Sequence, residues 1–254
     1  MEVHHPHHAN HKKKWNEHIQ EFLMLFFAVF LGFMSEYYLE YRAERHKEHD
    51  YLVSMVKDLK ADLSEMATKD KAMEELMNSG IKITSIIYKP TWDKTDEDSL
   101  YLNSINMVTR FVTLNFSSGT IDQLRNAGGF RLILNEEIVA KITEYEKGKQ
   151  LINVQQEAMM ERWSKVHHMQ NKIFHLNVFG QPDRTGKITL NREELNKIIS
   201  QTGKAFLTSD KNTFYEYSNY VNVCKGYVAF YEIMSKMQQQ KATDLIQLIN
   251  KELQ

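Results

Sequence analysis

The stretch EFLMLFFAVFLGFMSEYY, residues 21–38, decides the architecture that the sequence predicts. It holds thirteen consecutive apolar residues, from Phe22 to Met34, near the start of an otherwise polar chain. A bilayer core requires about 20 residues of helix, whereas apolar runs of about 10 to 14 residues are more often core helices or signal-peptide segments. Length alone therefore leaves three interpretations open: a membrane anchor, a signal peptide and a buried core helix.

The residues around this run favour an uncleaved membrane anchor. Trp15 precedes the run and a tyrosine-rich segment, residues 37–41, follows it, as expected of aromatic side chains at the two interfaces of a bilayer. Every face of the run is apolar, which is typical of a helix in lipid, whereas a core helix is expected to be amphipathic. No small-x-small cleavage site follows, although a signal peptide requires one. We therefore predict a transmembrane helix over residues 19–39, with the lipid bilayer as its partner.

Composition predicts an all-α chain. The 254 residues include only three prolines and ten glycines, and 42% of them are hydrophobic, enough for a substantial core in one domain or two. Lys plus Arg (32) and Asp plus Glu (33) nearly cancel, so no global field attracts nucleic acid and we expect no nucleic-acid partner. The one cysteine, Cys224, excludes an intramolecular disulfide framework, and its apolar helix face favours a buried inert thiol over a reactive one.

The helix is expected to continue past the anchor as a long stalk. Apolar residues recur at spacings of three and four between residues 52 and 77, opposite a charged face. This segment therefore needs another helix against which to bury its apolar face. A later helix of the same chain is favoured over an intermolecular coiled coil, because Asp62 and Asp70 interrupt a strict heptad. We expect Gly80 to loosen the helix. The stripe comprises Leu52, Met55, Val56, Leu59, Leu63, Met66, Met73, Leu76 and Met77.

Turn and capping signals predict a loop and two more helices after this stripe. Residues 88–98, YKPTWDKTDED, contain a proline and a run of acids, which is typical of a surface loop. A second helix is expected over residues 98–114. Ser117 or Ser118 is then expected to cap a short helix that ends at Gly128, where glycine permits the left-handed conformation.

The rest of the chain completes a helical bundle. Asn135 is expected to cap a third long helix, which carries acids in its first turn and extends towards Phe174. Residues 178–191, VFGQPDRTGKITLN, form an irregular segment suited to a turn or small hairpin. With a short helix over residues 192–201 and a long one from Asp210, we predict an all-α antiparallel bundle that follows the anchor and stalk. The apolar face of the last helix comprises Phe214, Tyr217, Val221, Cys224 and Val228.

Residues 119–146, GTIDQLRNAGGFRLILNEEIVAKITEYE, resemble the pattern T-x-x-x-L-x-x-x-G-x-x-x-L-I-x-N-x-x-I/L of a group of uncharacterised bacterial single-pass inner-membrane proteins. Glu21 stands just ahead of the apolar run, as an acidic residue does in that group, whereas the tryptophan that often follows the anchor there is absent. The resemblance implies an N-terminal anchor and a helical domain outside the inner membrane, and it implies no chemistry. The matching positions are Thr120, Leu124, Gly128, Leu132, Ile133, Asn135 and Ile138.

Orientation rests on the N-terminal tail. Three basic residues lie close to each end of the apolar run, so the usual charge rule gives a tie. We favour a cytoplasmic N-terminus because the lysines at residues 12–14 form a compact block beside histidines that are partly protonated near neutrality. Residues 1–18 are expected to be a disordered tail rich in histidine and lysine. These expectations place a helical domain, residues 40–254, in the periplasm and the anchor in a bacterial inner membrane.

The histidines of the tail are the sharpest candidate site. Imidazole is a ligand for zinc, nickel, copper and cobalt, and a flexible tail can bring several imidazoles to one ion. We expect weak binding of a divalent transition metal in vitro, whereas the lack of a fixed geometry disfavours a physiological metal role. No further cofactor is expected. The candidate ligands are His4, His5, His7, His8 and His11.

Other histidines are expected in ordinary roles. His46 and His49 lie three residues apart just after the anchor. Two histidines at this spacing on a helix can bind one metal ion, but a solvated helix face is favoured. Helix packing or solvent is the expected environment of His167, His168 and His175.

The remaining signals for chemistry are weak. Residues 181–192 resemble a calcium loop around Gly186, but Gln181 and Arg192 stand where carboxylates are required. Glu21 lies close to the membrane, where desolvation could raise the pKa of its carboxyl and suit it to proton handling. A capping role at the membrane interface is favoured instead. The sequence contains no GxSxG, HExxH or phosphate-loop motif, and we do not expect an enzyme.

Two functions from different classes follow from this interpretation. The favoured one is a membrane-anchored, non-enzymatic interaction or scaffold protein, whose periplasmic helical domain packs against a protein partner or another copy of itself. The alternative is a sensory or ligand-binding helical bundle that acts through a partner chain.

Overall fold

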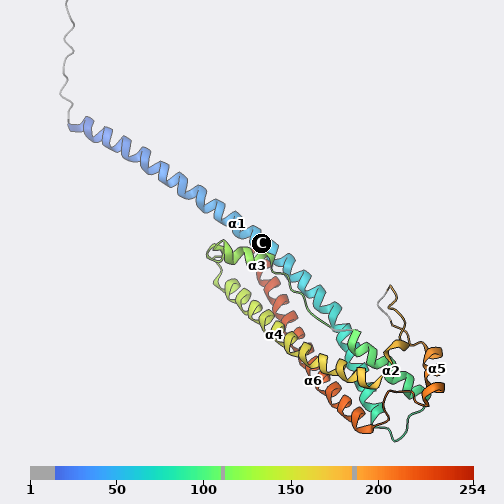
Figure 1. Ribbon diagram of the computed structural model, residues 1–254. Helices are drawn as coiled ribbons and strands as arrows, with labels where there is room; N and C mark the ends of the chain where they lie inside the picture. Colours follow the sequence, from blue (N-terminus) through green and yellow to red (C-terminus); the bar gives the residue numbers. More distant parts are fainter. Residues whose placement is uncertain (1–14, 110–111, 185–187) are drawn as a thin grey trace, which may run out of the picture. The chain divides into compact units, whose positions relative to one another are not determined.

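The computed structural model describes residues 15–109, 112–184 and 188–254 (Figure 1). These residues form the all-α fold that the sequence predicts, with one isolated β-bridge among them. The chain divides into two compact units, one through Tyr51 and one from Leu52 onward. The elements are α1 Trp15–Ile87, α2 Lys94–Thr109, α3 Gly119–Asn126, η1 Gly129–Leu132, α4 Glu136–Ile173, η2 Leu176–Val178, α5 Arg192–Thr202 and α6 Lys211–Glu252.

The apolar run lies within α1, which continues unbroken from Trp15 to Ile87, so the expected stalk helix is confirmed. The large apolar side chains from Phe22 to Leu39 are between 42% and 70% exposed. An 18-residue window of α1 is long and apolar enough to cross a membrane, and 0% of that window is buried. The run is therefore not a core helix of the described chain.

From Leu52 onward, the apolar stripe of α1 enters the core of the bundle. Met66 is 0% exposed, and it shares one hydrophobic cluster with side chains of α2, α4 and α6. The stripe therefore packs against later helices of the same chain, as predicted. Asp62, which interrupts the heptad, is also buried, at 1% exposure, and its carboxylate accepts two hydrogen bonds from other parts of the bundle.

Among the long helices of this unit, α6 runs opposite to α1 and α4. Helix α6 is antiparallel to both α1 and α4, since later residues of each partner contact earlier residues of α6. Figure 1 shows these three helices lying along one another. The contacts that set the register are Ser235 to Asp70 (3.1 Å) and Lys225 to Thr84 (3.5 Å) for α1, and Lys241 to Glu144 (3.3 Å) and Tyr231 to Gln156 (2.6 Å) for α4.

The expectation that Gly80 loosens the first helix is wrong. Gly80 is buried within α1, and a Cβ added there would lie 2.7 Å from Cγ of Lys225 on α6. The glycine therefore serves close packing between two helices, and the i to i−4 hydrogen bonds of α1 continue past it.

The expected bounds of the second helix are also wrong at both ends. Asp93 accepts a hydrogen bond from the Asp96 amide at 2.8 Å, so the acids assigned to a loop form the first turn of α2. Helix α2 ends at Thr109 instead of residue 114. At Leu114 the amide donates to Gln156 Oε1 at 2.6 Å and to Tyr231 Oη at 3.1 Å, so side chains of α4 and α6 hold this extended segment.

The corner between α3 and α4 follows the predicted capping pattern in part. Gly128 has a φ of 62°, as expected, and Asn135 accepts from the Glu137 amide at 3.0 Å. Ser118 occupies the N-cap position of α3, but its side chain makes no capping hydrogen bond. Asp58 of α1 accepts instead from the Thr120 amide at 3.0 Å, so the cap comes from another helix.

The irregular segment before α5, expected to form a turn or small hairpin, pairs its two ends through one antiparallel bridge. Phe179 and Leu190 form an antiparallel bridge, and the Asn191 amide donates to the Val178 carbonyl at 2.7 Å. Asn191 also caps α5 by accepting from the Glu194 amide at 3.1 Å. The last helix begins after Asp210, and all five residues of its predicted apolar face are buried.

Candidate functional site

The tail histidines lie outside the described residues, so the metal site stays a prediction. Among the residues that the structure describes, no group of three or more His, Cys, Asp and Glu side chains is placed to hold a metal ion. The residues concerned are His4, His5, His7, His8 and His11.

The other histidines occupy the ordinary positions that the sequence favours. The side chains of His46 and His49 are 79% and 58% exposed, and both lie 3.6 Å from the Asp50 carboxylate. His167 and His168 are exposed on α4. His175 is half-buried, and desolvation lowers the pKa of its imidazole. The structure therefore brings none of these side chains into a shared cluster of ligands.

The cysteine and the last residue of the apparent calcium loop have structural roles. Cys224 is 0% exposed on α6, as expected, and burial raises the pKa of its thiol to about 12. Arg192, at the last position of the apparent calcium loop, pairs with Glu97 at 3.6 Å and with Asp98, so it joins α5 to α2. Gly186 lies outside the described residues.

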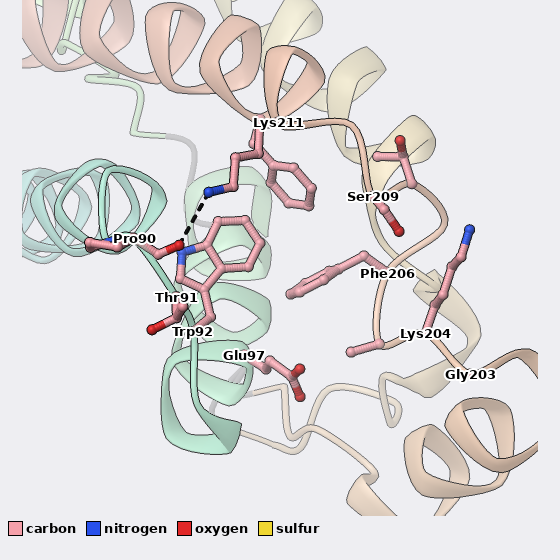
Figure 2. A pocket seen from close by; sticks show the side chains of 12 residues that line it. Pro90, Thr91, Trp92, Glu97, Gly203, Lys204, Phe206, Ser209 and Lys211 are labelled. Atoms are coloured by element: carbon pink, nitrogen blue, oxygen red, sulfur yellow. Dashed lines mark hydrogen bonds between the residues drawn. The ribbon is translucent and has the colours of Figure 1, made fainter.

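A pocket of about 410 Å³ opens at the end of the bundle where α1 stops (Figure 2). Two segments build it: the turn from Pro90 into α2, and the connection between α5 and α6 that starts at Gly203. Proline excludes continuation of α1, and Gly203, with a φ of 71°, ends α5 in the left-handed conformation. The two chain reversals leave a hollow between them.

Aromatic rings form the apolar part of this end pocket. The indole of Trp92 packs edge-on against Phe214 at 4.7 Å and Phe206 at 5.7 Å between ring centroids. Its Nε1 donates to the Ile86 carbonyl at 2.7 Å, which fixes the indole at the end of α1. Phe206 and Phe214 are 7% and 2% exposed, so they support the pocket from the core.

Charged groups surround the rings. Lys211 donates to the Pro90 carbonyl at 3.1 Å, and Lys204 lies on the opposite side of the pocket from Trp92 (Figure 2). The Glu97 carboxylate faces the pocket while pairing with Arg192 at 3.6 Å. An aromatic surface with a few charged groups at its edge suits a small molecule that has an apolar body and a polar end.

A buried polar cluster joins α1 to the α3 corner, and the sequence did not predict it. Asp62 accepts from the Ser117 amide at 2.6 Å and from the Tyr145 hydroxyl at 2.8 Å. Lys149 donates to the Ser117 carbonyl at 2.6 Å and pairs with Glu146 at 2.7 Å. Desolvation, together with the Asp62 charge, raises the pKa of the Tyr145 hydroxyl.

The missed signal was the spacing of two acids within an apolar stripe. Asp58 and Asp62 are one helical turn apart, so both carboxylates point from α1 towards the segment that begins α3. These carboxylates accept hydrogen bonds from the Ser117 and Thr120 amides and from the Tyr145 hydroxyl, and so they hold the corner in place.

Comparisons with known proteins found no matching family model, no matching curated protein and no matching solved structure. The resemblance of residues 119–146 to a group of bacterial inner-membrane proteins therefore stays a prediction.

Proposed function

We propose that this chain is a single-pass, membrane-anchored interaction or scaffold protein without enzymatic activity. In this proposal residues 19–39 cross a bacterial inner membrane, the short N-terminal tail is cytoplasmic, and residues 40–254 form a helical domain in the periplasm. The domain acts by binding another protein.

The exposure of the apolar run is the observation that supports an anchor. Fourteen large apolar side chains from Phe22 to Leu39 are at least 42% exposed. Moving such a side chain out of water contributes about 1.5–3 kcal/mol, so a bare run in water would cost on the order of tens of kcal/mol. A whole domain is stable by only about 5–15 kcal/mol. Lipid is the medium that removes this cost along all faces of a helix.

Fractionation of cells that express the full chain tests the anchor. We expect the intact mass in the membrane fraction and resistance to alkaline carbonate extraction. A variant with Phe26→Arg and Val29→Arg should lose this resistance, whereas exposed changes on the same helix, such as Lys60→Gln and Lys71→Gln, should retain it. Recovery of the wild-type chain in the soluble fraction contradicts the anchor, and a mass that lacks the apolar run identifies a cleaved signal peptide.

Crosslinking of the full chain in intact membranes tests the interaction role. Recovery of one protein in a fixed ratio to the chain, or of a defined homo-oligomer, supports the proposal. Labelling of single cysteines introduced in a Cys224→Ala background, one near residue 10 and one near residue 254, reports the orientation. A membrane-impermeant maleimide should label only the C-terminal position in cells with a permeabilised outer membrane.

The end pocket favours a second candidate, a ligand-binding bundle that works through a partner chain. Its aromatic walls and its volume of about 410 Å³ match a small organic molecule. Native mass spectrometry of the chain released gently from membranes tests this candidate. A stoichiometric small molecule that is lost in Trp92→Ala, and retained in Trp15→Ala, supports it, whereas an unliganded chain bound to a protein supports the first proposal.

A further inference from the structure

The outer surface of α4 and α6 has two ends of different character. We call the whole surface the α4–α6 face. Its basic end comprises Arg162, Lys165, His168 and Lys172 of α4, and its apolar end comprises Leu151 and Val154 of α4 with Phe230, Ile233 and Met237 of α6.

Helical register places these residues on one side of the bundle. Leu151 and Arg162 are eleven residues apart, as are Val154 and Lys165, and eleven residues make about three turns of helix. The hydrogen bond from Tyr231 to Gln156 sets α6 beside α4, so the apolar residues of the two helices lie at the same level.

The basic end is hollowed. Two adjoining hollows of about 560 Å³ and 310 Å³ lie between α4 and α6, and both are lined by Lys165 and Tyr220. The larger hollow contains one acid, Glu216 of α6, against three basic side chains of α4, namely Lys165, His168 and Lys172. Arg162 and Lys165 both approach the same oxygen of Glu161, at 3.5 and 3.7 Å, and that carboxylate is 65% exposed. The Arg162 guanidinium also hydrogen-bonds Tyr227. The Lys165 ammonium has only the long, exposed contact with Glu161, and its side chain is 44% exposed, so it remains able to bind an anionic group.

The apolar end consists of well-exposed side chains. Phe230, Ile233 and Met237 are 48%, 56% and 59% exposed, and Leu151 and Val154 beside them are 52% and 58% exposed. Exposed apolar side chains grouped on one face of a folded domain are typical of a contact surface. Val223, 46% exposed, continues it towards the hollows.

Charge argues against a second copy on this face. If two copies meet with their α4 helices parallel, basic end faces basic end and the like charges repel. If they meet antiparallel, each basic end lies on an apolar end and its cations lose water without a partner. A different chain with one acidic end and one apolar end meets neither cost.

Shape and layout argue against the bilayer surface as the occupant. A helix that lies on a membrane carries cationic and apolar side chains next to each other along its whole length. Here the two kinds are segregated along the helix axis, and the basic end is concave. A groove between two helices accepts a third helix, and from residue 151 to residue 172 it offers a length of about 32 Å.

We propose that the α4–α6 face binds an amphipathic helix of a protein partner, with acidic residues of that helix in the hollows beside Lys165 and its apolar residues on Phe230 and Ile233. This assignment rests on the proposed interaction function and specifies the chemistry of the partner.

Synthetic helical peptides of about 20 residues are suitable probes, because that length matches the face. The first carries leucines along one face of one half and glutamates along the same face of the other half. One control peptide replaces the glutamates by lysines, and another replaces the leucines by serines. Each labelled peptide is titrated with the full chain in nanodiscs of neutral lipid, with empty nanodiscs as the blank, and fluorescence anisotropy gives Kd.

The first peptide should bind roughly 10-fold more tightly than either control and more weakly at high salt. Lys165→Glu with Lys172→Glu should weaken it roughly 10-fold, and so should Phe230→Ser with Ile233→Ser. The matched control Lys60→Glu with Lys71→Glu, on exposed positions of α1, should leave Kd unchanged within about 2-fold. The milder Lys165→Gln with Lys172→Gln, with an unchanged melting curve, separates lost binding from lost folding.

Equal affinity for the glutamate and lysine peptides, or indifference to both pairs of variants, overturns the assignment. If anionic vesicles bind the wild-type chain but do not bind the variant with Lys165→Glu and Lys172→Glu, a membrane surface and not a partner helix occupies the face. A dimer that dissociates in Phe230→Ser with Ile233→Ser identifies a second copy. If a partner still crosslinks to these variants in membranes, the interaction function stands and only the surface is wrong.

Discussion

Replacing Asp62 by alanine removes the carboxylate that ties α1 to the α3 corner. Asp62 is 1% exposed and accepts hydrogen bonds from the Ser117 amide at 2.6 Å and the Tyr145 hydroxyl at 2.8 Å. Alanine leaves the buried Tyr145 hydroxyl and the part-buried Ser117 amide without an acceptor, and each such donor costs about 1–3 kcal/mol. We therefore expect Asp62→Ala to lower the free energy of unfolding by about 4 kcal/mol.

Smaller changes at the same site should give smaller losses. Tyr145→Phe removes one donor and leaves Asp62 with the Ser117 amide, so we expect a loss of about 1–2 kcal/mol. Asp62→Asn keeps one acceptor oxygen but turns an amide N–H towards the second donor, so its loss should lie between the other two. The two residues share a hydrogen bond, so a double-mutant cycle with Asp62→Ala should show a coupling of about 0.5–3 kcal/mol.

Urea unfolding of the full chain in mild detergent measures these losses, followed by tryptophan fluorescence, to which the buried Trp163 contributes. Glu74→Ala, at an exposed position of the same helix, is the matched control and should shift stability by no more than about 0.5 kcal/mol. A loss below about 1 kcal/mol for Asp62→Ala, or additive effects in the cycle, would refute the claim that this buried carboxylate holds the corner.

Three further outcomes follow from burial and from the tail. Burial raises the pKa of Tyr101 and of Tyr217 from 10.0 to about 12. The contribution of each neutral hydroxyl to the free energy of unfolding is therefore complete below pH 10 and is smaller by about 1.4 kcal/mol at pH 11. A urea midpoint that stays constant from pH 9 to 11 contradicts this expectation. The Cys224 thiol, with its pKa raised to about 12, should resist iodoacetamide at pH 8 in the folded chain and react in urea, and equal rates would show an accessible thiol. Changing the histidines of residues 4–11 to alanine should abolish nickel or zinc binding in a calorimetric titration, whereas retained binding would place the site elsewhere.

Local signals predicted much of the fold. The all-round apolar run, the stripe between residues 52 and 77, the Asn135 cap and the left-handed Gly128 each depend on a few neighbouring residues, and all appear in the structure. The errors lie where a distant side chain competes with a local signal. Ser118 has the residue type of a cap, but Asp58 of α1 takes the amide that Ser118 was expected to satisfy.

The candidate sites were less predictable for the same reason. The end pocket requires Trp92 and Phe206, which lie far apart in the chain and meet only when α1 and α5 end at the same level. The basic end of the α4–α6 face has a regular spacing on α4, but that spacing alone indicates a solvated helix face. The hollows form only because Tyr220 and Tyr227 of α6 pack beside it.

The sequence by itself determined an all-helical chain and an apolar helix with no polar face, because helix periodicity and hydrophobicity act through residues within a few turns. The tertiary structure alone decided how the long helices pair, which carboxylates are buried, and which side chains of α4 and α6 remain on the outside. These features depend on contacts such as Asp62 with Ser117 and Leu114 with Tyr231, between residues that chain connectivity does not bring together. Packing of the complete bundle supplies their partners, and only then are their hydrogen bonds and exposure defined.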